Sequence, residues 1–228
     1  MPGHPLNSSL LRNHPLLLGH RGARAVVGVR ENTLPAFDLA IAEGCDGFEF
    51  DVRLSADGQA FICHDAKTRR LEIARCSAQS LELPLLAAVL ARYRKKAFLD
   101  IELKVPGLEA LTIDLIQKYP PARGFVVSSF LPDVLQTIHN KTSKLPLGLI
   151  CETRAQLRRW VELAVEYVIP HYSLLAPKRV AEIKATGGKI LVWTVNSPAH
   201  MRRFAEWGVD GIISDHPERL VRALPPNR

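Results

Sequence analysis

The sequence predicts an α/β protein, a closed (β/α)₈ TIM barrel with a small β-hairpin extension after the second strand. Three observations lead to this prediction. Apolar strand-like runs alternate with amphipathic segments of helical periodicity, a pattern typical of parallel sheets with crossover helices. Eight such units in roughly 210 residues suit one barrel. No linker, low-complexity tract or repeat divides the 228 residues, so we expect a single domain over residues 1–228. An open, doubly wound sheet is the alternative.

The expected elements follow one another along the chain. Strand-like runs lie near residues 16–20, 47–53, 97–103, 124–129, 146–150, 166–170, 189–195 and 209–214. Helical segments lie at 32–43, 82–95, 108–119, 131–141, 153–163, 177–186, 198–207 and 217–224. Several of these segments end at a glycine, namely Gly44, Gly187 and Gly208, as is common at helix C-termini.

The stretch "GFEFDVRLSADGQAFICHD", residues 47–65, predicts the hairpin extension. Asp57-Gly58 is a strong signal for a tight turn between two strands. A hairpin centred there pairs residues whose numbers sum to about 113 or 114. This register returns His64 to the neighbourhood of Glu49 and Asp51. Strand alternation places Cys63 on the face opposite His64, which argues against a Cys–His nucleophilic pair.

Composition narrows the function classes. The net charge is +7, but the basic clusters are dispersed, so we expect no nucleic-acid partner and only a mild preference for anionic ligands. No apolar run is long enough to span a membrane, and the N-terminal segment lacks the basic region of a signal peptide. We therefore expect a cytoplasmic protein without stable membrane insertion. The four cysteines show no CxxC spacing and are expected to be reduced.

Three carboxylates are expected to converge at the mouth of the barrel, where active sites of this fold form. Glu49 and Asp51 share one face of the second strand, and Glu102 lies on the third. A divalent cation would remove their mutual repulsion, and ligands that are all oxygen favour Mg²⁺, Ca²⁺ or Mn²⁺. The alternative is a buried ion network in which Arg21, Lys104 or Arg53 neutralises the carboxylates.

His20 and His64 are expected at the rim of this cluster. Two histidines beside one site can serve as general base and general acid. Arg21 and Lys104 would meet an anion there, and with a divalent cation nearby the natural group is a phosphate. A purely structural role for each histidine is the alternative.

The sequence resembles the glycerophosphodiester phosphodiesterases, in a bacterial-type short form, along nearly the whole chain. The matching pieces are "GHRG" at 19–22, "ENTLPAF" at 31–37, "GFEFDV" at 47–52, "HD" at 64–65, "IELK" at 101–104, "SSF" at 128–130, "WTVN" at 193–196 and "GVDGIISDHP" at 208–217. The resemblance implies a (β/α)₈ barrel that uses a divalent cation to hydrolyse glycerophosphodiesters to glycerol 3-phosphate and an alcohol.

Residue by residue, the resemblance implies an acid/base pair, His20 and His64, and three metal ligands, Glu49, Asp51 and Glu102. It also implies substrate-binding residues: Arg21, Lys104, Glu31 and Trp193. Glu31 has the alternative role of a helix N-terminal acid stabilised by the helix dipole, and Trp193 that of a core residue.

Two departures from the family pattern stand out. Arg30 replaces the proline that usually precedes "ENT", which should alter a loop and not the chemistry. The segment between Asp65 and Leu83 is short where many members carry an insertion, so we expect an open leaving-group side. The rival functions are a lysophospholipase D-like or phospholipase C-like enzyme, which would want an apolar entry surface, and a non-catalytic phosphodiester-binding barrel.

Overall fold

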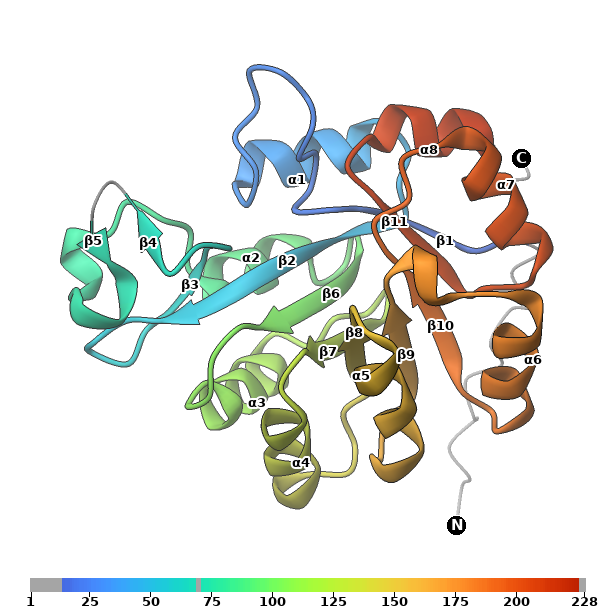
Figure 1. Ribbon diagram of the computed structural model, residues 1–228. Helices are drawn as coiled ribbons and strands as arrows, with labels where there is room; N and C mark the ends of the chain where they lie inside the picture. The colour runs from blue at the N-terminus through green and yellow to red at the C-terminus, as the bar shows by residue number, and fades with distance from the viewer. Residues whose placement is uncertain (1–13, 69–70, 226–228) are drawn as a thin grey trace, which may run out of the picture.

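Eight parallel strands close into a barrel, in a computed structural model that describes residues 14–68 and 71–225 (Figure 1). In ring order these strands are β1 (Leu16–Gly19), β2 (Gly47–Leu54), β6 (Phe98–Leu103), β7 (Phe125–Ser129), β8 (Leu147–Cys151), β9 (Tyr167–Pro170), β10 (Lys189–Val192) and β11 (Gly211–Ser214). The ring closes because β1 pairs with both β2 and β11. The predicted barrel is thus confirmed, and the open sheet is excluded.

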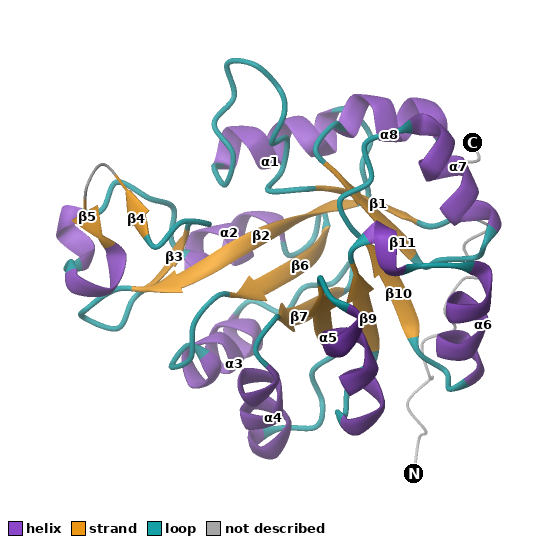
Figure 2. Cartoon of the chain, in the orientation of Figure 1, coloured by secondary structure: helices purple, strands orange, loops and turns teal. Residues whose placement is uncertain are grey.

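The helices form an outer layer around the strands (Figure 2). They are α1 (Leu34–Ala42), α2 (Leu86–Tyr93), α3 (Glu109–Lys118), α4 (Pro132–Lys141), α5 (Arg154–Arg158), α6 (Pro177–Ala185), α7 (Pro198–Glu206) and α8 (Pro217–Ala223). Gly44, Gly187 and Gly208 follow α1, α6 and α7 with positive φ angles, as expected for helix ends.

Two helices, α2 and α5, differ from the predicted ranges by more than two residues at one end. The segment predicted at 82–95 becomes helical only at Leu86, because the carbonyl of Pro84 accepts a hydrogen bond from Ile62 N at 2.8 Å and the chain stays extended there. The segment predicted at 153–163 begins with a capping box between Thr153 and Gln156, but after Arg158 it continues as the 3₁₀ helix η3 (Arg159–Glu162).

Alternation along β2 separates the core from the interior of the barrel. Phe48 packs against the helices, stacked on Phe37 of α1 at 4.3 Å and edge-on to Tyr93 of α2 at 4.9 Å. Successive strand residues point to opposite faces, so Glu49 and Asp51 point into the barrel. The packing of the phenylalanines therefore fixes the direction of the carboxylates.

The hairpin extension has the predicted register. β3 (Ala60–Ile62) runs antiparallel to β2, with Val52 opposite Ile62 and Leu54 opposite Ala60. The following chain forms a two-stranded pair, β4 (Lys67–Thr68) and β5 (Leu71–Glu72), and the short 3₁₀ helices η1 (Ile73–Arg75) and η2 (Ala78–Ser80). These pack around a small apolar cluster of Phe61, Ile73 and Leu81, with Cys63 against it.

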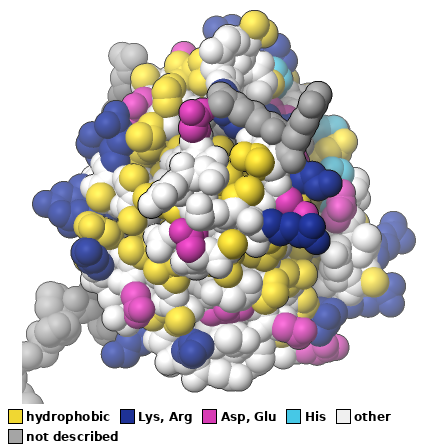
Figure 3. All heavy atoms as spheres, turned by 90° about the vertical axis from the view of Figure 1, so that its left-hand side faces the viewer, with side chains coloured by type: hydrophobic (Ala, Val, Ile, Leu, Met, Phe, Trp, Pro, Cys, Tyr) yellow, Lys and Arg dark blue, Asp and Glu magenta, His cyan; other side chains and the backbone are white. Residues whose placement is uncertain are grey.

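The remaining predictions about composition meet the structure only in part. All four cysteines are free. On the face shown in Figure 3, Lys and Arg side chains are spread out and not gathered into one stripe. Within the part of the chain that the structure describes, none of the helices combines the length and apolar character needed to span a bilayer. The N-terminal segment 1–13, with His4, and the basic pair at 69–70 lie outside the described residues.

Candidate active site

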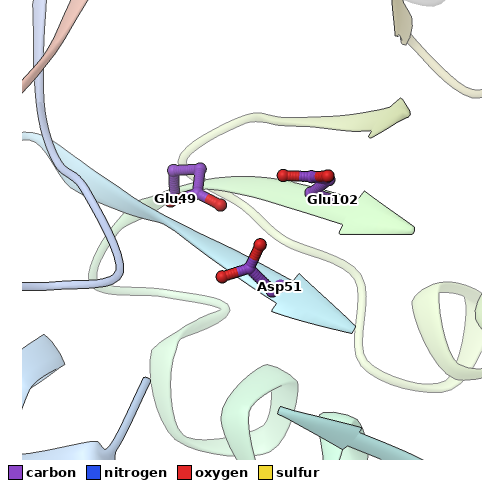
Figure 4. A group of neighbouring side chains, drawn as sticks. All are labelled: Glu49, Asp51 and Glu102. Carbon is purple, nitrogen blue, oxygen red and sulfur yellow. The ribbon is translucent and has the colours of Figure 1, made fainter. Parts of the chain in front are cut away.

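The three predicted carboxylates meet inside the barrel. Glu49 and Asp51 project from β2 and Glu102 from β6, and their side chains point toward one another (Figure 4). One oxygen of each lies within 4.8 Å of the others, and all three side chains are buried. Strand pairing explains the meeting, because Asp51 stands directly opposite Glu102 in the parallel β2–β6 ladder.

Two cations partly neutralise this cluster, and one amide donates a hydrogen bond to it. Lys104 Nζ lies 2.6 Å from Glu102 Oε1 and 3.2 Å from Asp51 Oδ1. Arg21 Nε lies 3.3 Å from Asp51 Oδ2, and Asn32 Nδ2 donates to the same oxygen at 2.7 Å. Part of the expected ion network is therefore present.

Arg53, the third cation considered for the network, does not take part in it. Its side chain donates instead from Nε to the backbone carbonyl of His64 at 2.7 Å. Arg53 lies two residues beyond Asp51, where β2 has left the barrel and pairs with β3.

The pKa shifts follow from this uneven compensation. Burial, together with the charges of Asp51 and Glu102, raises the pKa of Glu49 well above its usual range. Burial and the charge of Asp51 also raise the pKa of Glu102, to about 7. Burial opposes ionisation of Asp51 as well, but Lys104, Arg21 and the hydrogen bond from Asn32 outweigh it and lower its pKa. Lys104 and Arg21 therefore offset the negative charge of Asp51 most and that of Glu49 least.

This arrangement suits a divalent cation. Oε1 of Glu49 is buried and has no hydrogen-bond partner among the described residues, and a bound cation would satisfy it. The other oxygen of Glu49 accepts only the backbone N–H of Arg21, at 2.9 Å. Three carboxylates facing one point form the all-oxygen donor set that hard divalent cations prefer. The acidic residues therefore form a site that could hold a divalent metal.

His20 is fixed by a carboxylate that the sequence analysis did not single out. Its Nδ1 lies 2.6 Å from Asp215 Oδ1, and both side chains are buried. Burial would raise the pKa of Asp215, but the contact with His20 and the hydrogen bond from Asn196 hold it below the usual value. Because Asp215 is then ionised, it accepts a hydrogen bond from the N–H at His20 Nδ1. The opposite nitrogen, Nε2, faces the cluster at 3.7 Å from Glu49 Oε2.

His64 sits in a more open place. It follows β3, its Nδ1 lies 2.8 Å from Asp65 Oδ1, and its side chain is 37% exposed. The bond from Arg53 to the His64 carbonyl fixes the backbone here. His64 and His20 line the same cavity, so the two histidines face one space from the segments that follow β3 and β1.

That cavity has a volume of about 250 Å³ and two unlike halves. The lining residues of one half are polar: His20, Arg21, Glu49, His64, Asp100, Glu102 and Lys104. The other half is largely apolar, and its lining is Phe130, Ile150, Glu152, Ile169, Trp193 and Ile213. Within the described part of residues 66–83 no side chain lines the cavity. The open leaving-group side stays a prediction.

The last two predicted substrate residues lie beside the cavity. Trp193 donates from its indole N–H to the Ile169 carbonyl at 2.9 Å and packs edge-on to Phe130. It is half-buried and lines the cavity, so it is more than a core residue. Glu31 does not line the cavity; it pairs with Arg21 at 2.7 Å and with Arg24 at 3.2 Å. Glu31 therefore reaches the site through Arg21.

Sequence reasoning missed Asn32 and Asp215 as site residues. Both lie inside motifs that the sequence analysis quoted, "ENT" and "SDHP". The available signal was a polar residue directly beside an acid or a histidine of the motif. Asn32 has a φ of 55°, in the left-handed region that asparagine tolerates well. His171 and His216 lie outside the cavity lining, and His216 directly precedes Pro217 at the start of α8. His14, His139 and His200 are half-buried and also lie away from it.

Comparisons with known proteins identify the family to which this chain belongs. A family model described as the glycerophosphoryl diester phosphodiesterase family matches residues 20–112 and 109–219. A glycerophosphodiester phosphodiesterase of Caldanaerobacter subterraneus subsp. tengcongensis is 30% identical, over 92% of this chain and 97% of its own. The crystal structure of such an enzyme from Thermotoga maritima superposes with a TM-score of 0.80 at 27% identity, covering 92% of this chain and 98% of that one.

A further solved structure is an Oleispira antarctica phosphodiesterase in complex with its product sn-glycerol-3-phosphate. It has a TM-score of 0.82 and 25% identity, over 92% of this chain and 97% of that chain.

Proposed function

The chain belongs to the glycerophosphoryl diester phosphodiesterase family, and from this premise we propose that it is a metal-dependent enzyme that hydrolyses glycerophosphodiesters to glycerol 3-phosphate and an alcohol. One observation carries the proposal. Two histidines that follow different strands, β1 and β3, face the same cavity as the buried carboxylates Glu49 and Glu102. Acid and base are thereby available on the two sides of a group held between them.

His20 is the general base of the proposed reaction. Asp215 accepts a hydrogen bond from Nδ1–H, so the neutral imidazole presents an unprotonated Nε2 to the cavity. That nitrogen can take a proton from the nucleophile, either a water molecule or the glycerol hydroxyl of the substrate. The ionised Asp215 then stabilises the imidazolium that forms.

His64 is the general acid. It lies on the open side of the cavity, beside the segment that contributes no lining residue, where a released alcohol meets solvent. Its contact with Asp65 orients the ring, so that the opposite nitrogen can deliver a proton to the leaving oxygen.

Lys104 and Arg21 bind the phosphate. Both side chains are largely buried and already face the acidic cluster, so little ordering is needed when an anion arrives. Glu49, Asp51 and Glu102 would hold a divalent cation, Mg²⁺, Ca²⁺ or Mn²⁺. When bound, the cation supplies positive charge that offsets the negative charge on the phosphoryl oxygens.

Trp193 and Glu31 complete the substrate site in different ways. The ring of Trp193 gives the carbon atoms of the substrate an apolar wall. Glu31 holds the guanidinium of Arg21 in position through their 2.7 Å contact.

The test is a hydrolysis panel. Glycerophosphocholine, glycerophosphoethanolamine, glycerophosphoglycerol and lysophospholipids are incubated with enzyme, and phosphorus NMR identifies the product. The reaction is run after chelation and again with each of the three metals added. We expect glycerol 3-phosphate only with metal, and a large loss for His20→Ala. His139→Ala, on the outer helix α4, is the matched control and should retain activity. Release of a different phosphate ester, or undiminished turnover by His20→Ala, would contradict the proposal.

A further inference from the structure

A turn at residues 23–30, between β1 and α1, exposes an apolar tip. In Figure 1 it is the blue loop that rises above α1. The side chain of Val27 projects fully into solvent, and the residue is 98% exposed. A Cβ atom placed on the neighbouring Gly28 would meet nothing within 4 Å. Val26 and Val29 flank this tip and are half-buried.

The turn is held in a defined shape. Val29 N donates to the carbonyl of Val26 at 3.2 Å, which closes the turn with Val27 at a corner. Its base is fixed by Ala25 N, which donates to the Asp215 carbonyl at 3.1 Å. Corners of surface turns usually carry Gly, Asn, Asp or Ser. The side chain of Val27 does not pack against the rest of the molecule, so it is free to contact another surface.

The tip stands at the mouth of the active site. The same connection carries Arg21 and Glu31, which belong to the substrate site described above. Cationic side chains flank the tip, because Arg24 and Arg30 are both exposed. Nε of Arg24 lies 3.2 Å from Oε2 of Glu31, and this ion pair holds Arg24 at the base of the turn.

A cationic groove lies on the opposite side of the mouth. The groove has a volume of about 480 Å³ between α5 and α6, and its lining is Arg154, Leu157, Arg158, Leu174, Ala176, Lys178, Arg179 and Glu182. Only Arg179 is paired, with Glu182 at 2.6 Å. Arg154, Arg158 and Lys178 have no acidic partner in the described part of the chain.

The fold places this groove across from the turn. α5 and α6 follow β8 and β9, and connections after barrel strands all lie at the C-terminal face. In the ring of eight strands, β8 is four positions from β1 in either direction. An apolar tip and a group of unpaired cations therefore face outward on opposite sides of one mouth.

We propose that this mouth docks on an anionic lipid surface, with Val27 inserted at the interface and Arg154 and Lys178 against the lipid headgroups. A flat anionic surface can meet both sides of the mouth at once. An acidic protein would need a continuous patch of matching shape, and here the apolar and cationic parts are separated by the cavity. The contact is peripheral and reversible, because one valine and dispersed cations anchor a protein only weakly. The inference goes beyond the proposed function and does not require turnover.

The test is co-sedimentation of the protein with vesicles. Vesicles of phosphatidylcholine alone are compared with vesicles that also contain phosphatidylglycerol, at low salt and at about 0.5 M NaCl, where charge interactions are screened beyond roughly 4 Å. We expect partitioning to the anionic vesicles at low salt and its loss at high salt. Absence of binding to anionic vesicles, or equal binding to neutral ones, overturns the inference.

Matched variants test each side of the mouth. Val27→Asp should weaken binding about tenfold, because it removes the apolar contact and adds a like charge. Val161→Asp is the control: Val161 is 67% exposed, and it lines a hollow at the other end of the barrel with residues that precede β9 and β10. The double variant Arg154→Glu, Lys178→Glu should weaken binding at least about 25-fold, from roughly fivefold for each cation. Arg203→Glu, in the last turn of α7, is its control.

The readouts separate this inference from the proposed function. Val27→Asp should hydrolyse water-soluble glycerophosphocholine at a rate within about twofold of wild type, because Val27 touches no residue of the site. Vesicle binding without hydrolysis would leave the inference standing and refute the function. Wild-type vesicle binding by Val27→Asp, or an equal loss in Val161→Asp, overturns the inference whatever the activity.

Discussion

The contact between Asp215 and His20 should contribute measurably to turnover. Asp215 accepts from His20 Nδ1 at 2.6 Å, and Asn196 Nδ2 donates to its other oxygen at 2.7 Å. Asp215→Asn keeps the size of the side chain and removes its charge. The amide can also donate to Nδ1, which would leave the proton on Nε2 and block the nitrogen that acts as base.

The size of the effect follows from the burial of the pair. A hydrogen bond to a charged group contributes about 1.5–3 kcal/mol. At about 1.36 kcal/mol for each factor of ten, its loss lowers kcat roughly 10- to 150-fold. Asp215 does not line the cavity, so KM should change less than about threefold.

The assay is steady-state hydrolysis of glycerophosphocholine by purified variants whose folding is checked by circular dichroism. Asp38→Asn is the matched control, because Asp38 also pairs closely with a cation, Arg92 at 2.6 Å, but on the outer helices. A kcat for Asp215→Asn within threefold of wild type, or a loss that appears only in KM, would refute the positioning role of Asp215.

Four further predictions concern the same site. Glu49→Gln should weaken Mn²⁺ binding at least about tenfold, as measured by isothermal titration calorimetry. Unchanged binding would show that the metal binds at another site. His20→Ala and His64→Ala should each lower kcat roughly 10²–10⁴-fold, and a variant with near-normal kcat would return that histidine to a structural role. Lys104→Ala should lower kcat/KM equally for choline, ethanolamine and glycerol head groups, among which the wild type should differ by less than about tenfold; a hundredfold preference would reveal a head-group pocket. Because the pKa of Asp215 is lowered on folding, its stabilisation is present above its ordinary value of 3.8 and is lost as the pH falls below it, so the Tm gap between wild type and Asp215→Asn should narrow as the pH falls from about 4 to about 2; a constant gap would argue against the charge effect.

Local signals were sufficient for the barrel and for its hairpin. Alternating periodicity predicted the eight strands, and Asp57-Gly58 predicted a register that the pairing of Val52 with Ile62 confirms. The predicted start of a helix was wrong where a residue distant in the sequence holds the chain extended. The extended chain at Pro84 is held by Ile62 of β3, and no pattern near Pro84 shows that contact.

The acidic cluster was predictable for a similar reason. Glu49 and Asp51 are two residues apart in a strand, so they had to share a face, and strand order brought Glu102 opposite Asp51. The partner of His20 was not predictable in this way. Asp215 lies 195 positions after His20 in the sequence, and the two meet only because β1 and β11 close the ring.

The sequence by itself determined the fold class, the face on which the carboxylates lie, and the return of His64 toward them, because each follows from a short-range period or turn. Only the tertiary structure decided how the charges are shared. Lys104 pairs with Asp51 and Glu102, and Arg53 donates to the backbone of His64 instead. Among the described residues, Oε1 of Glu49 has no hydrogen-bond partner. The tertiary structure also placed an exposed valine on one side of the mouth. On the opposite side it placed a groove in which Arg154, Arg158 and Lys178 have no acidic partner among the described residues. The physical reason is that periodicity fixes directions along one strand, whereas hydrogen bonds, charge compensation and exposure depend on distances between strands that meet only when the barrel closes.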